Sequence, residues 1–191
     1  MPNFLDRRYQ GYRIAILVAA GAAAILTSRA RHIAAQSPEV TVKSAPELVG
    51  SKWLNTSRPI TLASRKGKVT MVEFWTFECS NCLANLAAYE RWQKKYGPMG
   101  FTIIGVHTPE LKAERDETRL KAFIAEKGIT YPVLVDNDNK NWDRWSQEYW
   151  PAIYLVDKSG KVRAKWIGEL DSMGSGGEET VAKKIEGLIS E

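Results

Sequence analysis

Cysteine and histidine are scarce in this chain, with two of each among its 191 residues. Two cysteines cannot build the multi-bridge framework of a small secreted scaffold, so a packed core must stabilise the fold. A zinc site needs about four ligands, and beyond the cysteine pair only His32 and His107 remain. Covalent haem attachment needs a histidine directly after the second cysteine, whereas Leu83 is there. We therefore expect no resident metal, haem or other cofactor.

Positive charge is not in excess where a nucleic-acid-binding surface would need it. The net charge is +5, and residues 1–35 contribute +4 of it through five arginines and one aspartate. The rest of the chain is left with +1. A phosphate-binding footprint is therefore not expected in that part, and nucleic acid is excluded as a partner.

Long apolar runs are also rare, and residues 14–26 form the clearest one. The run has arginines on both sides, and its length suits a signal-peptide core better than a comfortable membrane span of about 20 residues. The position before Gln36 is a poor cleavage site because Ile33 stands where a small residue is needed. We expect residues 1–35 to be an uncleaved signal anchor, with a cleaved signal peptide as the alternative. Residues 36–50 are expected to form a linker, and residues 51–191 a single domain.

The two cysteines, Cys79 and Cys82, lie between an apolar run at residues 69–75 and a helical pattern that extends to Tyr96. The apolar run predicts a strand buried on both faces. At a helix start, unpaired N–H groups and the positive end of the helix dipole favour a thiolate on Cys79. Cys82 is then one turn away, within disulfide reach. The pattern predicts a redox-active dithiol; a structural disulfide, half of a zinc site and two core thiols are the alternatives.

Strands and helices are expected to alternate along the rest of the domain. Residues 69–106 read as strand, helix, strand, which requires parallel strands joined by a right-handed crossover. Further strands are expected at residues 53–54, 60–62 and 133–135 and in a hairpin at residues 153–167; further helices are expected before Gly128, at residues 139–148 and near residues 181–189.

Particular sequence strings resemble a known family. Val72-Glu73-Phe74-Trp75 before the cysteine pair looks like the active-site strand of thioredoxin, and His107-Thr108-Pro109-Glu110 and Tyr149-Trp150-Pro151-Ala152 extend the match. The pattern resembles exported thiol–disulfide oxidoreductases of the TlpA/ResA type, most closely the thioredoxin-like domain of DipZ proteins. This resemblance implies an α/β thioredoxin-like fold, with a central mixed sheet flanked by helices.

The resemblance also implies roles for individual residues. Cys79 would attack a substrate disulfide, Cys82 would resolve the mixed disulfide, and Glu73 would accept the proton of Cys82. Pro151 matches the cis-proline of the family, and Trp150 would offer backbone groups to an extended substrate segment. Trp75 would flank the dithiol.

Two further positions carry weaker expectations. His107 ends a strand at the carboxyl edge of the sheet, where α/β folds place their sites, although a surface or turn-capping histidine is at least as common there. Glu78 puts a carboxylate beside the attacking cysteine; if partly buried, it would raise the pKa of Cys79. Ser80-Asn81 replaces the Gly-Pro of thioredoxin, and Ala87 stands where relatives often carry a helix-kinking proline.

The family resemblance further implies partners and a compartment. Substrates would be cysteine-containing exported proteins, and a transmembrane thiol electron donor would recharge the dithiol. The domain would work at the periplasmic or extracytoplasmic face of the inner membrane, anchored by residues 14–26, or in the periplasm after cleavage. Reduction is favoured over oxidation as the working direction.

Two other functions compete with disulfide exchange. Thr76 stands three residues before Cys79, which is the spacing of thiol peroxidases of the peroxiredoxin type. Val72 occupies the place of the peroxidase proline, and those enzymes do not usually place a disulfide partner at Cys82. A non-enzymatic metal-handling adaptor is the third candidate, but the cysteines lack nearby histidine and methionine ligands that copper(I) would favour.

Overall fold

A six-stranded mixed sheet forms the centre of the structure, a computed structural model that describes residues 43–191. The strand order is β1-β4-β3-β2-β5-β6. The strands are β1 (Trp53–Leu54), β2 (Thr70–Trp75), β3 (Thr102–His107), β4 (Val133–Val135), β5 (Ala152–Val156) and β6 (Val162–Ile167). This is the thioredoxin-like α/β architecture that the resemblance implies.

Strand β2 lies inside the sheet, between β3 and β5, and all six of its residues are buried. It runs parallel to β3, with Glu73 opposite Gly105, and antiparallel to β5, with Glu73 opposite Ile153. Helix α2 (Ser80–Ala84) and helix α3 (Leu86–Tyr96) connect β2 to β3. The predicted crossover is therefore present, and it places the cysteine pair at the carboxyl end of the most buried strand.

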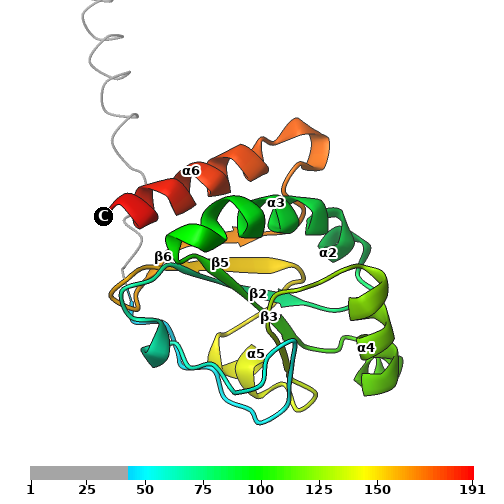
Figure 1. Cartoon of the computed structure of the whole chain (residues 1–191). Helices are drawn as coiled ribbons and strands as arrows, with labels where there is room; N and C mark the ends of the chain where they lie inside the picture. Colours follow the sequence, from blue (N-terminus) through cyan, green and yellow to red (C-terminus); the bar gives the residue numbers. More distant parts are fainter. Residues whose placement is uncertain (1–42) are drawn as a thin grey trace, which may run out of the picture. The chain divides into compact units, whose positions relative to one another are not determined.

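Two hydrophobic clusters cover the two faces of the sheet. Helices α3, α4 (Glu117–Glu126) and α6 (Gly177–Ser190) pack on one face, around Met71 and Trp75 of β2. Helix α5 (Lys140–Arg144) and the segment before β2 pack on the other, around Val72 and Phe74. Figure 1 shows α3 and α6 side by side over one face and α5 against the opposite face.

Several predicted boundaries are wrong. Residues 60–62 are not a strand but lead into a short helix, η1 (Ala63–Arg65). Helix α5 ends at Arg144, earlier than predicted, because the chain turns at Trp145 and Ser146 takes a positive φ of 50°. The helix predicted over residues 79–96 is divided at Asn85 into α2 and α3, although no proline is present.

Residues 43–50, part of the predicted linker, pack against the domain. Leu48 is buried, with 5% of its surface exposed. The Glu47 carboxylate accepts hydrogen bonds from the N–H groups of Leu62 (2.6 Å) and Ala63 (3.1 Å). The domain therefore begins several residues before the predicted boundary.

The apolar run at residues 14–26 and the cleavage position before Gln36 lie outside the described residues. Within residues 43–191, no helix is long and apolar enough to cross a membrane.

Candidate active site

The cysteine pair forms a disulfide at the start of α2. Cys79 is the N-cap residue with extended backbone angles, and the backbone N–H of Cys82 donates a hydrogen bond to its sulfur (3.2 Å). Cys82 is 2% exposed, whereas Cys79 is partly exposed. The same N–H is placed to stabilise a thiolate on Cys79 after reduction. The two sulfurs thus differ in access, and Cys79 is the one that a substrate can reach.

Glu73 lies inside the domain, beneath the dithiol end of β2, with 1% of its surface exposed. Burial raises the pKa of its carboxyl from 4.5 to about 7, although hydrogen bonds from Tyr131 and Tyr89 lower it in part. The Tyr131 hydroxyl donates to Glu73 Oε1 at 2.6 Å. Tyr131 and Tyr89 belong to the same buried cluster as Cys82. Glu73 can therefore hold or release a proton near neutral pH.

Trp75 does not offer its ring to a substrate. It is 1% exposed and packs edge-on against His107 and obliquely against Phe123. Its indole nitrogen finds no hydrogen-bond acceptor among the described residues. The expectation that Trp75 flanks the dithiol as a substrate-binding residue is therefore corrected: its side chain supports the site from within the core.

His107 is neither a surface nor a turn-capping residue. It is fully buried, and its ring stacks on Phe77 with 5.5 Å between ring centroids. Burial is the main reason that its pKa falls from 6.5 to about 4, against the opposing charge of Glu114. Its Nε2 lies 3.3 Å from the Thr76 hydroxyl oxygen. The imidazole is neutral at physiological pH and is part of the support beneath residues 76–78.

Glu78 points away from the disulfide toward α4. Its carboxylate forms an ion pair with Arg119 at 2.6 Å, and the Arg119 guanidinium lies over the Phe77 ring at 5.2 Å. Its charge is therefore balanced at the protein surface. The predicted unfavourable effect on a Cys79 thiolate is reduced accordingly.

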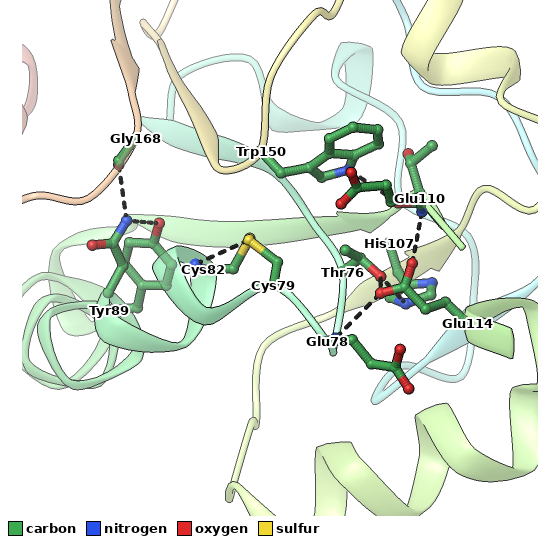
Figure 2. Close-up of a disulfide and its surroundings, with 12 residues drawn as sticks. Thr76, Glu78, Cys79, Cys82, Tyr89, His107, Glu110, Glu114, Trp150 and Gly168 are labelled. Atoms are coloured by element: carbon green, nitrogen blue, oxygen red, sulfur yellow. Dashed lines mark hydrogen bonds between the residues drawn. A yellow bond between two sulfur atoms is a disulfide. The ribbon is translucent and has the colours of Figure 1, made fainter. Parts of the chain in front are cut away.

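The peptide bond between Trp150 and Pro151 is cis, and Trp150 packs against the same hydrophobic cluster as Cys79. The Trp150 indole N–H donates to the carbonyl oxygen of Thr108 at 3.0 Å, and its ring stacks on Trp142 with centroids 3.8 Å apart. The neighbouring Tyr149 is 56% exposed. Figure 2 shows Trp150 across from Cys79, with Thr76 and His107 beneath.

Sequence reasoning missed Glu114, a buried carboxylate close to the dithiol. It lies in the short helix η3 (Lys112–Arg115) and accepts hydrogen bonds from the Thr76 hydroxyl (2.5 Å) and the Glu78 N–H (3.2 Å). In the sequence it is one charged residue among many between positions 110 and 119, and no periodicity marks it as buried. A capping box would mark a glutamate at a helix start, but it needs a serine or threonine three residues earlier, where this chain has Leu111.

Among residues 43–191, no group of three or more His, Cys, Asp or Glu side chains is placed to hold a metal ion.

Comparisons with known proteins agree with this geometry. The model of the AhpC/TSA family matches residues 34–165. The chain is 40% identical over 131 residues to Protein DipZ of Mycobacterium bovis, a match that covers 67% of this chain and 19% of that protein. It is 30% identical over 148 residues to thiol-disulfide oxidoreductase YkuV of Bacillus subtilis, covering 76% of this chain and 94% of that one.

A solved structure agrees as well. The solution structure of a thioredoxin-like protein in the oxidised form superposes with a TM-score of 0.66 at 29% identity. It covers 78% of this chain and 96% of that one. The chain spans only about a fifth of the DipZ protein that it matches, and nearly all of YkuV. The chain belongs to the AhpC/TSA family, and within it to the thioredoxin-like thiol–disulfide oxidoreductases.

Proposed function

We propose that this protein exchanges disulfides with protein substrates through Cys79 and Cys82, working as a reductant outside the cytoplasm. The observation that carries the proposal is the asymmetry of the pair. Cys79 is partly exposed at the start of α2 and accepts the N–H of Cys82, whose own sulfur is buried. An accessible nucleophile beside a shielded partner is the arrangement that a two-step exchange needs.

In the first step the Cys79 thiolate attacks one sulfur of the substrate disulfide. A mixed disulfide forms, and the other substrate sulfur leaves as a thiolate. In the second step Cys82 loses its proton and attacks Cys79, which releases the substrate as a dithiol and leaves the Cys79–Cys82 disulfide seen here. Two electrons pass from the protein to the substrate.

The proton of Cys82 needs an acceptor inside the domain, and we assign that role to Glu73. Its pKa of about 7 lies near the working pH, which is the condition for an effective general base. The backbone next to the cis peptide at Trp150 and Pro151 would receive an extended substrate segment, strand to strand.

The peroxidase alternative is weakened by the position of the Thr76 side chain. Its hydroxyl is fully buried and donates its proton to Glu114 at 2.5 Å. A peroxide bound at Cys79 would need that hydroxyl turned toward the sulfur. The Thr-x-x-Cys spacing is thus present in the sequence, while the hydroxyl is committed elsewhere.

The compartment, tether and partners belong to the same proposal. Residues 14–26 would anchor the protein in the inner membrane, with the domain on the periplasmic side, where disulfides persist. A soluble periplasmic form would result if the segment is cleaved. Cysteine-containing exported proteins would be the substrates, and a transmembrane thiol donor would restore the dithiol.

A trapping experiment tests the proposal. Cys82→Ser should accumulate mixed disulfides with substrate proteins, because Cys79 can attack but the resolving thiol is missing; Cys79→Ser should abolish insulin-disulfide reduction. Equal trapping by both variants would refute the assignment of the nucleophile. The reduction potential of the pair tests the direction: a value near −270 mV, about that of thioredoxin, supports a reductant, and one near −120 mV an oxidant.

A further inference from the structure

The Glu114 carboxylate lies between two segments that are distant in sequence. Its Oε1 accepts the Thr76 hydroxyl (2.5 Å) and the Glu78 N–H (3.2 Å), both from the segment that leads into Cys79. Its Oε2 accepts the N–H groups of Glu110 (2.7 Å) and Leu111 (2.6 Å), from the loop that follows β3. Figure 2 shows Glu114 beside Thr76, Glu78 and Glu110. The two oxygens thus join two different loops.

The loop after β3 also holds the wall of the substrate site. Thr108, two residues before Glu110, accepts the Trp150 indole N–H at 3.0 Å. The Thr108 N–H in turn donates to the carbonyl oxygen of Trp75 at 3.0 Å. One side of the Glu114 carboxylate is therefore connected to the nucleophile and the other to the tryptophan opposite it.

We propose that Glu114 is a positioning residue that fixes the segment carrying Cys79 relative to the loop that supports Trp150. The inference rests on the proposed function, because it takes Trp150 and Pro151 as the place where the substrate segment is held. Glu114 would not touch the substrate. It would set the geometry in which the Cys79 sulfur meets a disulfide aligned along the cis-proline backbone.

The arrangement of donors explains why a carboxylate occupies this position. Four donors converge on two oxygens; in an amide an NH₂ donor would replace one of these acceptors, and in a neutral acid one oxygen would carry a proton and act as a donor. Burial alone would raise the pKa of Glu114, but hydrogen bonds from the Thr76 hydroxyl and three backbone N–H groups outweigh it and lower the pKa. The carboxylate is therefore ionised at neutral pH.

His107 completes the arrangement from beneath. The Thr76 hydroxyl donates its hydrogen bond to Glu114, so its oxygen can only accept a hydrogen bond from the His107 ring. This assigns the neutral tautomer with the proton on Nε2. The Thr76 side chain is thus held from two sides.

A purely local role for Glu114 would need only one of its oxygens. Capping the start of η3 uses Oε2, through the N–H of Leu111 three residues away. The bonds of Oε1 instead reach across 38 residues to Thr76 and 36 residues to Glu78. These long-range bonds are the part that capping does not require.

Two reactions separate positioning from the intrinsic reactivity of Cys79. Reduction of insulin disulfides depends on how the sulfur faces the bound segment, whereas alkylation of Cys79 by iodoacetamide does not. In Glu114→Gln the amide NH₂ replaces one of the two accepting oxygens. The donors of one of the two loops then lose their acceptor, and that loop is no longer held. We expect kcat/KM for insulin to fall at least tenfold, since misplacement of reacting atoms by about 1 Å can cost 100-fold, while the alkylation rate of Cys79 stays within about twofold.

Matched variants keep the test decisive if Glu114→Gln does not fold. Thr76→Val removes one donor to Oε1 at nearly constant volume and should lower insulin reduction in the same selective way. Thr76→Ser keeps the hydroxyl and should retain the insulin-reduction rate of the unaltered protein. Glu126→Gln, on the exposed face of α4, serves as the control for loss of a negative charge.

Other outcomes would overturn the proposal. A parallel fall of insulin reduction and alkylation would mean that Glu114 acts on the thiolate itself. Unchanged rates for both reactions would leave it a stability residue only. Failure of the unaltered protein to reduce insulin would refute the proposed function instead, and this is seen without any variant.

Discussion

Glu73 links the chemistry of the site to the stability of the fold. Its pKa is about 7 in the folded protein, against an ordinary value of 4.5, because the carboxyl is buried. Between these pH values the folded protein binds more protons than the unfolded chain. The stabilisation from protonated Glu73 is therefore complete below about pH 4.5 and is lost as the pH rises through 7. A carboxyl ready to accept a proton thus lowers stability at neutral pH.

Glu73→Gln should remove this pH dependence. The difference between the two pKa values corresponds to about 3 kcal/mol. The variant should therefore gain up to about 3 kcal/mol in free energy of unfolding over the unaltered protein between pH 4.5 and pH 8, as measured by urea denaturation. The same variant should release the mixed disulfide more slowly in stopped-flow experiments. Parallel stability profiles for the two proteins would show that Glu73 does not titrate in this range.

Gly105 leaves the space in which Glu73, Trp75 and Tyr131 meet. A Cβ at this position would lie 2.8 Å from Trp75 Nε1 and 3.1 Å from Tyr131 Cε2. Gly105→Ala should therefore lower the free energy of unfolding by about 1–3 kcal/mol, as overpacked cores do. Gly187→Ala is the matched control, because nothing lies near that position in α6 and alanine should stabilise the helix by about 0.5–1 kcal/mol. An unchanged Gly105→Ala variant would show that this cluster can move apart freely.

Site residues could be predicted from the sequence where a reactive residue type occurs at a characteristic place in a local pattern. The cysteine pair at a helix start and the glutamate in an apolar strand follow from local pattern, and both lie where that pattern places them. Glu114 and the buried state of His107 could not be predicted. Their environment is made by Thr76 and Phe77, more than 25 residues away in sequence, and only the folded sheet brings them together.

At the level of elements, the division of the active-site helix at Asn85 shows the limit of periodicity. The apolar spacing continues across Asn85, so a sequence reading joins α2 and α3. The side chain of Asn85 is buried, accepts the Leu170 N–H at 2.9 Å and donates to the Gly168 carbonyl oxygen at 3.3 Å. The active-site helix is thus tied to the loop before α6 by contacts that no local pattern reveals.

Asn85→Ala should show how much this connection contributes to the free energy of unfolding. It would leave the buried N–H of Leu170 without its partner, and an unsatisfied buried polar group costs about 1–3 kcal/mol. We expect a loss of about 3 kcal/mol in free energy of unfolding by urea denaturation, since the Gly168 bond is lost too. Lys94→Ala, exposed on α3, should change stability by less than about 0.5 kcal/mol. Equal effects of the two substitutions would contradict the structural role of Asn85.

At the level of the whole molecule, the fold was predictable while the start of the domain was not. Buried strands and the crossover helix are strong local signals, and the family resemblance implied the thioredoxin-like fold into which they are arranged. Residues 43–50 contain Pro46, Gly50 and scattered polar groups and therefore read as a linker. They join the domain through long-range bonds: Val49 exchanges hydrogen bonds with the Asn141 side chain at 2.9 and 2.7 Å, and the Ala45 N–H donates to Gly160.

A pair of truncations tests where the folded unit begins. A chain that starts at Lys43 keeps Leu48 in its cluster and the partners of Asn141, so its free energy of unfolding should equal that of residues 43–191 in the full-length protein. A chain that starts at Ser51 should lose about 3 kcal/mol or more, from uncovered apolar surface and from the unpaired Asn141 amide. Leu48→Ala in the longer chain should cost about 2–5 kcal/mol if packing is the main term. Identical urea midpoints for the two truncated chains would show that residues 43–50 are a linker after all.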